Sequence, residues 1–253
     1  MAGRQKLRIL CFGDSLTAGY SSLGAIYHPY AEMLIQFLEM AFPEMDVEAD
    51  IEGEPGETVK FGFLPRMQGL FSPKNTEGNK NYDWAIVLGG TNDLARGISD
   101  EEIFHTLKAV WDVPLRRNIK VIALTVPEPG VKVGEASAAK RIALNDAIKS
   151  YRRTNFHAFD LATAMPYFKM SPRDQQRYWD DAIHYTPDGY DFIGNKIGTF
   201  LVSLLAKEKA ENHPSPAKRR RYFKDDEKVF DEEDDGQRAI DRGYVVVRRR
   251  DLD

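Results

Sequence analysis

Five short, mainly apolar segments, most of them separated from the next by a stretch with the signals of a helix, constrain the fold of this chain most. They span residues 8–12, 47–51, 82–88, 120–126 and 156–161. The third is the clearest, because residues 84–88 are apolar throughout, as in a strand that is buried on both faces. Strands that alternate with helices favour a parallel sheet with helices on both sides. We therefore predict an α/β fold, with three layers (α/β/α) around a five-stranded parallel sheet.

Four stretches beside these segments carry the signals of helices. Apolar residues recur at helical spacing over 30–42, after 100 and after 187, and 135–153 is rich in Ala, Lys and Arg, which favour helices. Ser99 and Thr186 stand where N-caps are expected, and Thr186 is followed by the proline that favours a first helical turn. Residues 165–180 show no such period, so we expect an irregular, aromatic loop there.

Ser15 directly follows the first predicted strand, in a turn that leads towards a helix. Open α/β sheets bind ligands where their strands end, and a backbone N–H that begins a helix stabilises negative charge. Ser15 is therefore a candidate nucleophile for acyl transfer. The residues alone leave two other roles open, since Gly-Asp-Ser is also a common turn and serine often caps helices.

Four blocks of the sequence resemble those of the SGNH (GDSL) hydrolase family. They contain Ser15 in Gly-Asp-Ser, Gly56 in Gly-Glu-Pro-Gly, Asn92 in Gly-Thr-Asn-Asp and His184 in Asp-Ala-Ile-His, in that order. The resemblance covers about residues 7–207. It implies a flavodoxin-like sheet of five strands, in agreement with the five segments above, and the hydrolysis of esters by a serine nucleophile.

Ester hydrolysis by serine needs a base, a group that orients the base, and donors for the oxyanion. His184 is the candidate base, because a neutral imidazole can take the hydroxyl proton of Ser15 and return it to the leaving alcohol. Asp181 can reach His184 from the same turn and hold its tautomer. Asp180, the adjacent carboxylate, is the alternative, but the family carries its aspartate three residues before the histidine.

The resemblance assigns the oxyanion hole to the backbone N–H groups of Ser15 and Gly56 and the side-chain amide of Asn92. Each would lie on a loop that leaves one of the first three strands, where parallel strands end together. Without the resemblance, Gly56 would be a turn glycine and Asn92 an Asx-turn residue. The second block also departs from the family, which often has an asparagine upstream of this glycine.

Three polar neighbours of these residues are expected to fix loops through hydrogen bonds to the backbone rather than to transfer protons. They are Asp14, Thr91 and Asp93. The nucleophile elbow Gly-x-Ser-x-Gly of α/β-hydrolases is disfavoured, because Thr17 occupies the position of its last glycine.

The expected substrate is a small carboxylic ester with an acetyl or a short- to medium-chain acyl group. The aromatic segment 165–180, with Trp179 before Asp181, is expected to wall the acyl site and to position the Asp–His turn, and loop packing explains its aromatic residues equally well. Thioesters and lysophospholipids are alternative substrates, and a non-catalytic flavodoxin-like binding module is the alternative function. No glycine-rich phosphate motif is present, and the five histidines are isolated, so we expect neither a cofactor nor a metal.

A change of composition predicts two parts of the chain. We expect the hydrolase domain to span 1–207 and a charged, disordered tail to span 208–253. The tail separates basic from acidic runs, with four cations at 218–221 and five anions at 231–235. A solvated charge run, a protein-binding tail and a nuclear-import patch all fit these runs.

Charge and cysteine content bear on partners and compartment. The formal net charge is −4, from 35 basic and 39 acidic residues, which gives no general expectation of nucleic-acid binding. No apolar run reaches the roughly 18 residues that a membrane span needs. Cys11 is the only cysteine and lies in an apolar strand, and the N-terminal residues lack the pattern of a signal peptide. We therefore expect a cytoplasmic protein, or a nuclear one if the basic run at 218–221 acts as a nuclear-import patch.

Overall fold

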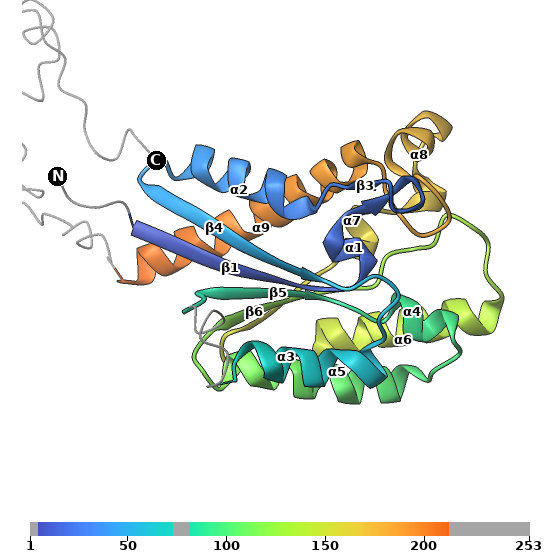
Figure 1. Cartoon of the computed structure of the whole chain (residues 1–253), viewed down its shortest axis with the longest axis horizontal. Coiled ribbons are helices and arrows are strands. Elements are labelled where there is room, and N and C mark those ends of the chain that lie inside the picture. The colour runs from blue at the N-terminus through green and yellow to red at the C-terminus, as the bar shows by residue number, and fades with distance from the viewer. Residues whose placement is uncertain (1–4, 73–80, 213–253) are drawn as a thin grey trace, which may run out of the picture. The chain divides into compact units, whose positions relative to one another are not determined.

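The structure is a computed structural model that describes residues 5–72 and 81–212 (Figure 1). Its main sheet has five parallel strands in the order β4-β1-β5-β6-β7. The strands are β1 (Gln5–Gly13), β4 (Met45–Gly53), β5 (Trp84–Leu88), β6 (Lys120–Leu124) and β7 (Phe156–Phe159). All five predicted strands are confirmed. Two of them end about two residues early, β7 because Asp160 caps the short helix α7 (Leu161–Ala164).

Helices cover both faces of this sheet, as predicted for a three-layer fold (Figure 1). Helices α2 (Tyr30–Ala41) and α9 (Pro187–Asn212) lie on one face. On the other lie α3 (Leu64–Leu70), α5 (Asp100–Leu115) and α6 (Glu135–Ser150). Alternate residues of β1 divide between the two cores, with Ile9 and Cys11 on the α2–α9 side and Leu10 and Phe12 on the other.

Ser99 caps α5 as predicted, its side chain accepting a hydrogen bond from the backbone N–H of Glu102. The expectation for 165–180 was wrong in part. Helix α8 (Pro172–Tyr178) forms there, with Ser171 accepting from the N–H of Asp174 and a proline at the first helical position. A seven-residue helix is too short for its apolar period to stand out in the sequence.

Three strands end in register at the edge where β1 ends. Gly13 of β1 pairs with Gly53 of β4 and with Leu88 of β5. The next residues along the chain therefore begin side by side, although they are far apart in sequence. Ser15, Gly56 and Asn92 follow these three strand ends by two to four residues, which places all three candidate segments at one edge of the sheet.

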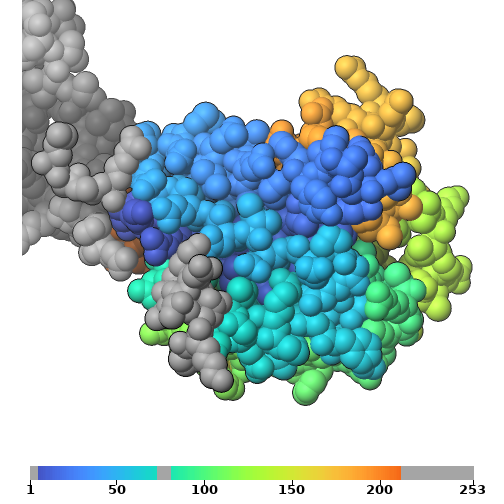
Figure 2. Space-filling view, viewed as in Figure 1, coloured from blue at the N-terminus to red at the C-terminus, as the bar shows by residue number. Residues whose placement is uncertain are grey.

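Several short elements also lie at this edge. They are α1 (Ser15–Ala18), the hairpin of β2 (Tyr20–Ser21) and β3 (Ile26–Tyr27), a π-helical turn η2 (Val59–Phe63) and α4 (Thr91–Ala95). Figure 2 shows the hairpin, in blue, against the gold and orange segment that contains α8. No helix in the described residues is long and apolar enough to cross a membrane. The charged residues 213–253, on which most of the tail prediction rests, lie outside the described part of the chain.

Candidate active site

Ser15 begins helix α1, directly after β1 and its neighbour Asp14. The Asp14 carboxylate is the N-cap and accepts a hydrogen bond of 3.0 Å from the backbone N–H of Leu16. Gly13 permits the tight turn, because a side chain there would collide with Thr17 and with the carbonyl of Leu88. The local sequence thus presents the hydroxyl of Ser15 at the strand end, with 5% of the residue exposed.

His184 and Asp181 reach Ser15 from the turn before α9. The His184 Nε2 lies 3.0 Å from the Ser15 Oγ, and its Nδ1 lies 2.8 Å from the Asp181 Oδ2. The Asp181 Oδ1 accepts the backbone N–H groups of Ile183 and His184, both at 2.7 Å. Burial opposes ionisation of Asp181, but these donors and the imidazole outweigh it and lower the pKa of the carboxyl. The structure therefore joins the three residues that the sequence singled out in one hydrogen-bonded chain.

Asp180, the alternative partner of His184, has another role in this geometry. Its carboxylate accepts a hydrogen bond of 2.6 Å from the backbone N–H of Ser22 in the turn between β2 and β3. Its own N–H donates to the carbonyl of His184 at 3.0 Å, which closes the turn. The geometry thus favours Asp181 as the imidazole partner.

Aromatic side chains hold this turn in place. The ring of Tyr20 packs on the imidazole of His184, with the ring centroids 4.6 Å apart. Trp179 and Tyr185 flank the turn as partners in an isolated β-bridge, and their rings pack edge to face. Trp179 is buried, as expected for a residue that positions the Asp–His turn. Tyr20 was not predicted, because its position in a glycine- and serine-bearing loop gives no sign of a contact with a residue 164 positions later.

The loop that carries Gly56 is tied to Asn92 and, through it, to Ser15. Gly56 adopts a positive φ of 80°, which glycine allows without strain. The Asn92 amide donates a hydrogen bond of 2.9 Å to the carbonyl of Glu57. The same amide nitrogen lies 3.4 Å from the carboxylate of Asp14, the residue before the nucleophile. Both predicted oxyanion segments thus lie beside the turn that holds Ser15.

Asp93 fixes the far side of the same loop. Its fully buried carboxylate accepts the backbone N–H groups of Val59 at 2.8 Å and Lys60 at 3.0 Å. Burial raises the pKa of Asp93, and these two hydrogen bonds oppose the rise. The expectation that hydrogen bonds to the backbone fix these loops is confirmed for Asp14 and Asp93. It was wrong for Thr91, whose buried hydroxyl oxygen has no hydrogen-bond partner within the described residues.

Arg66, from α3, was not predicted from the sequence. Its guanidinium donates to the carbonyls of Gly13 at 2.6 Å and Glu52 at 2.8 Å, and its Nε donates to the Glu57 carboxylate at 2.8 Å. It also lies over the ring of Phe12, 3.9 Å from its centroid. One side chain therefore ties together the ends of β1 and β4 and the Gly56 loop.

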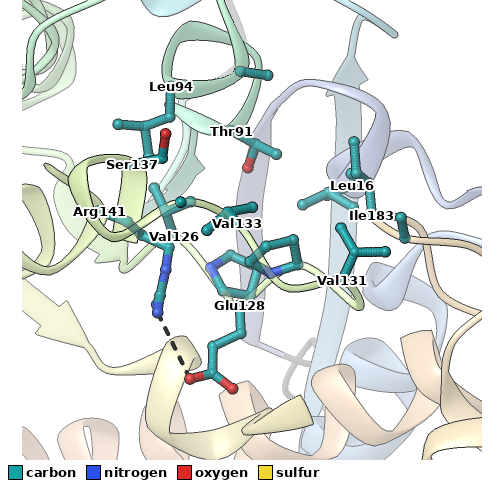
Figure 3. Close-up of a pocket in the computed structure, with 15 residues that line it drawn as sticks. Leu16, Thr91, Leu94, Val126, Glu128, Val131, Val133, Ser137, Arg141 and Ile183 are labelled. Atoms are coloured by element: carbon teal, nitrogen blue, oxygen red, sulfur yellow. Dashed lines mark ion pairs between the residues drawn. The ribbon is translucent and has the colours of Figure 1, made fainter. Parts of the chain in front are cut away.

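A pocket of about 420 Å³ opens beside this site (Figure 3). Aliphatic side chains form most of its wall, and Arg141, Glu128, Thr91 and Ser137 are its polar members. The aliphatic and proline residues are Leu16, Leu94, Ala95, Val126, Pro127, Pro129, Val131, Val133, Ala182 and Ile183. The hydrogen bond from Gly130 N to the carbonyl of Ala182, 2.7 Å long, joins the loop after β6 to the Asp–His turn.

The prediction that segment 165–180 walls this pocket was wrong, because none of its residues lines it. Its aromatic rings instead pack behind the site, Tyr167 against Trp179 and Trp179 against Tyr185. The loop after β6 was expected at the same edge of the sheet and does line the pocket. Within the described residues, no group of three or more His, Cys, Asp or Glu side chains could hold a metal ion.

A family model and solved structures match a large part of this chain. Residues 11–192 match the model of the GDSL-like Lipase/Acylhydrolase family. A search of curated proteins finds no match.

Solved structures share the fold at low sequence identity. A mutant of an acetyl-xylooligosaccharide esterase from Geobacillus stearothermophilus superimposes with a TM-score of 0.59 and 18% identity, covering 78% of this chain and 94% of the other. A lipase/acylhydrolase from Enterococcus faecalis gives 0.59 and 22%, covering 78% and 96%. An α/β hydrolase enzyme from the metagenome of Lake Arreo, Spain, gives 0.60 and 22%, with the same coverage.

Proposed function

The chain belongs to the GDSL-like lipase/acylhydrolase family and is a carboxylic ester hydrolase, and we propose that it works through an acyl-enzyme on Ser15. The observation that carries this proposal is the hydrogen-bonded chain from Asp181 through His184 to Ser15, with contacts of 2.8 and 3.0 Å. An Nδ1–H of His184 that donates to Asp181 leaves Nε2 free to accept the serine proton.

In the acylation step, the Ser15 oxygen attacks the ester carbonyl carbon while His184 Nε2 takes the hydroxyl proton. The carbonyl oxygen becomes an oxyanion. His184 then gives the proton to the alkoxide that leaves, so that the alcohol departs neutral and the acyl group stays on Ser15. Asp181 remains ionised throughout and stabilises the imidazolium, a role that its lowered pKa supports.

In the deacylation step, a water molecule takes the place of the alcohol, and its oxygen attacks the acyl carbonyl carbon while His184 takes one of its protons. The second tetrahedral intermediate collapses as the proton returns to the Ser15 oxygen, which releases the carboxylic acid. We assign the oxyanion donors to the N–H groups of Ser15 and Gly56 and to the amide of Asn92. The hydrogen bond to Glu57 uses one N–H of the Asn92 amide and holds the amide beside Ser15. The second N–H, whose contact with Asp14 is a long 3.4 Å, is the donor that we assign to the oxyanion.

The pocket supports an ester with a short- to medium-chain aliphatic part. Its volume of about 420 Å³ lies in the ~300–1,000 Å³ range of small-molecule sites, and its wall is mainly aliphatic. The structural neighbours include an esterase of acetylated xylooligosaccharides, so acetyl esters belong in the same substrate panel.

The test is the hydrolysis of p-nitrophenyl acyl esters by Ser15→Ala, His184→Ala and the double variant. Each single change should lower kcat by about four orders of magnitude, and the double change should cost little more, because the residues act as a unit. Ser203→Ala and His105→Ala, which change exposed residues on α9 and α5, are the matched controls. Single variants within about tenfold of the unchanged protein would refute the assignment.

A further inference from the structure

Arg141 introduces a charge into an otherwise aliphatic pocket. It lies on α6 and lines the pocket, and Figure 3 shows its side chain extending past Val126 towards Glu128. The Glu128 carboxylate lies 3.6 Å from an Arg141 amino group, too far for a hydrogen bond. These two are the only charged residues among those that line the pocket in the described part of the chain.

Arg141 and Arg66 are buried to a similar extent but differ in their partners. Their side chains are 15% and 20% exposed. Arg66 donates three hydrogen bonds, to a carboxylate and two carbonyls. Arg141 donates none within the described residues, and its Nε is buried without an acceptor. The buried Nε–H carries a desolvation cost. The amino groups of Arg141 are not buried and make no hydrogen bond within the described residues, so they can donate to a ligand in the pocket.

We propose that Arg141 and Glu128 form the polar end of the substrate pocket and select esters whose pocket-bound chain carries a neutral oxygen acceptor, such as a ketone or hydroxyl. This inference rests on the proposed function, because it names the substrate class of the same site. The aliphatic wall would hold the carbon chain, and the amino groups of Arg141 would donate to the oxygen near its end.

Glu128 is the reason why we expect the acceptor to be uncharged. This carboxylate already balances the charge of Arg141, and its other oxygen lies 3.4 Å from the N–H of Phe168. A second carboxylate would be desolvated beside Glu128 with no further cation lining the pocket. A ketone adds no charge and still accepts the hydrogen bond.

An unsubstituted chain would leave the Arg141 donors without an acceptor while displacing water from the pocket. Hydrogen bonds to charged groups are worth enough to change kcat/KM by about ten- to hundredfold. We therefore expect a preference of at least about tenfold for the ketone-bearing ester over its unsubstituted match.

The experiment uses the full chain and two matched sets of esters. The first set varies the acyl group: p-nitrophenyl pentanoate, hexanoate and heptanoate, each beside the 4-, 5- or 6-oxo ester of the same length. The second varies the alcohol: acetates of straight-chain alcohols with and without a ketone. A preference in the first set assigns the pocket to the acyl chain, and one in the second assigns it to the alcohol. Either supports the proposal.

Three variants separate selection from general damage. Arg141→Met should reduce the ketone preference to about twofold or less, because it keeps much of the aliphatic length and removes every donor. Glu128→Gln should shift selection towards a chain that ends in a carboxylate. Lys140→Met is the matched control on the same helix; Lys140 does not line this pocket, so the preference should persist.

The proposal is overturned if neither set shows a ketone preference, if Arg141→Met keeps that preference, or if the unchanged protein favours a terminal carboxylate over the ketone. These outcomes require measurable ester hydrolysis. If the unchanged protein hydrolyses none of the esters and Ser15 does not react with a fluorophosphonate, the proposed function itself fails, which is a different result.

Discussion

The two sides of the Ser15 site are built differently. On the Gly56 side, directional hydrogen bonds that Asn92 and Arg66 donate and Asp93 accepts hold the loop to the strand ends. On the pocket side, the loop after β6 presents Val131 and Val133, which are 48% and 44% exposed. We infer that the Gly56 side, which we assign to the oxyanion, is fixed in position. The pocket side, which we assign to the substrate, can be substituted with little effect on the fold.

The first prediction concerns Asp14, on the fixed side. Burial, opposed by the N–H of Leu16 and reinforced by Asp93, raises the pKa of this carboxyl from 3.8 to about 7. Between these values the folded state binds a proton that the unfolded state has lost, so the free energy of unfolding falls as the pH rises from about 4 to about 7. A shift of about three pKa units corresponds to about 4 kcal/mol.

Asp14→Asn keeps the acceptor for Leu16 and removes this titration. Urea unfolding gives the free energy of unfolding of both proteins at pH 4.5 and at pH 8. The difference between variant and original protein should rise by about 3 kcal/mol, in favour of the variant, from pH 4.5 to pH 8. Asp146→Asn, at an exposed carboxylate, is the control and should show no such gain. An equal difference at both pH values would contradict burial of an ionisable Asp14.

The second prediction concerns Asn92. Asn92→Ala should lower kcat by about a hundredfold or more, about 3 kcal/mol, with a smaller change in KM, because its amide is assigned to the oxyanion. Steady-state kinetics measures this, and urea unfolding shows whether loss of the bond to Glu57 also destabilises the fold. A rise in KM at constant kcat would assign Asn92 to ground-state binding instead.

The third prediction concerns Arg66. Arg66→Met leaves the Glu57 carboxylate without its partner and two carbonyls without their donor, and should lower the free energy of unfolding by about 2 kcal/mol. Combining it with Glu57→Gln should recover part of the loss, since the unpaired charge is removed. No recovery in the double variant would mean that the lost carbonyl contacts, rather than the charge, account for the cost.

The strands could be predicted because their signal is local, as in Trp84–Leu88, which is apolar throughout. The grouping of Ser15, Asp181 and His184 came from the resemblance of four sequence blocks to a known family, because the residues alone left other roles open for Ser15 and two candidate partners for His184. Arg66, Tyr20 and Arg141 could not be predicted, because their roles depend on partners far away in sequence. Arg66, for instance, meets Gly13 across 53 positions. Nothing in a basic residue of a helix distinguishes such a contact from a solvated one.

The pocket wall was placed wrongly for a related reason. Aromatic residues near Asp181 suggested a wall, but the rings of Tyr167 and Trp179 pack on each other behind the turn. The wall comes instead from small aliphatic residues and prolines of a loop, which have no period to mark them. Aromatic content alone therefore did not distinguish a supporting cluster from a binding surface.

The fourth and smallest prediction concerns the pocket side. Val131→Ala should change the free energy of unfolding by less than about 1 kcal/mol, because the side chain is 48% exposed. It should still change the ratio of kcat/KM between longer and shorter acyl chains severalfold, as measured with p-nitrophenyl esters of increasing length. A large loss of stability would remove the contrast between the two sides.

The central claim is that Ser15 is the nucleophile and that His184 and Asp181 activate it. The most direct measurement is reaction of the full chain with a fluorophosphonate, followed by mass spectrometry of the peptides. We expect one equivalent of label on Ser15, protection by an ester substrate, and very slow labelling in His184→Ala. Label on a different residue, or labelling of Ser15 that is as fast in His184→Ala as in the unchanged protein, would contradict the account.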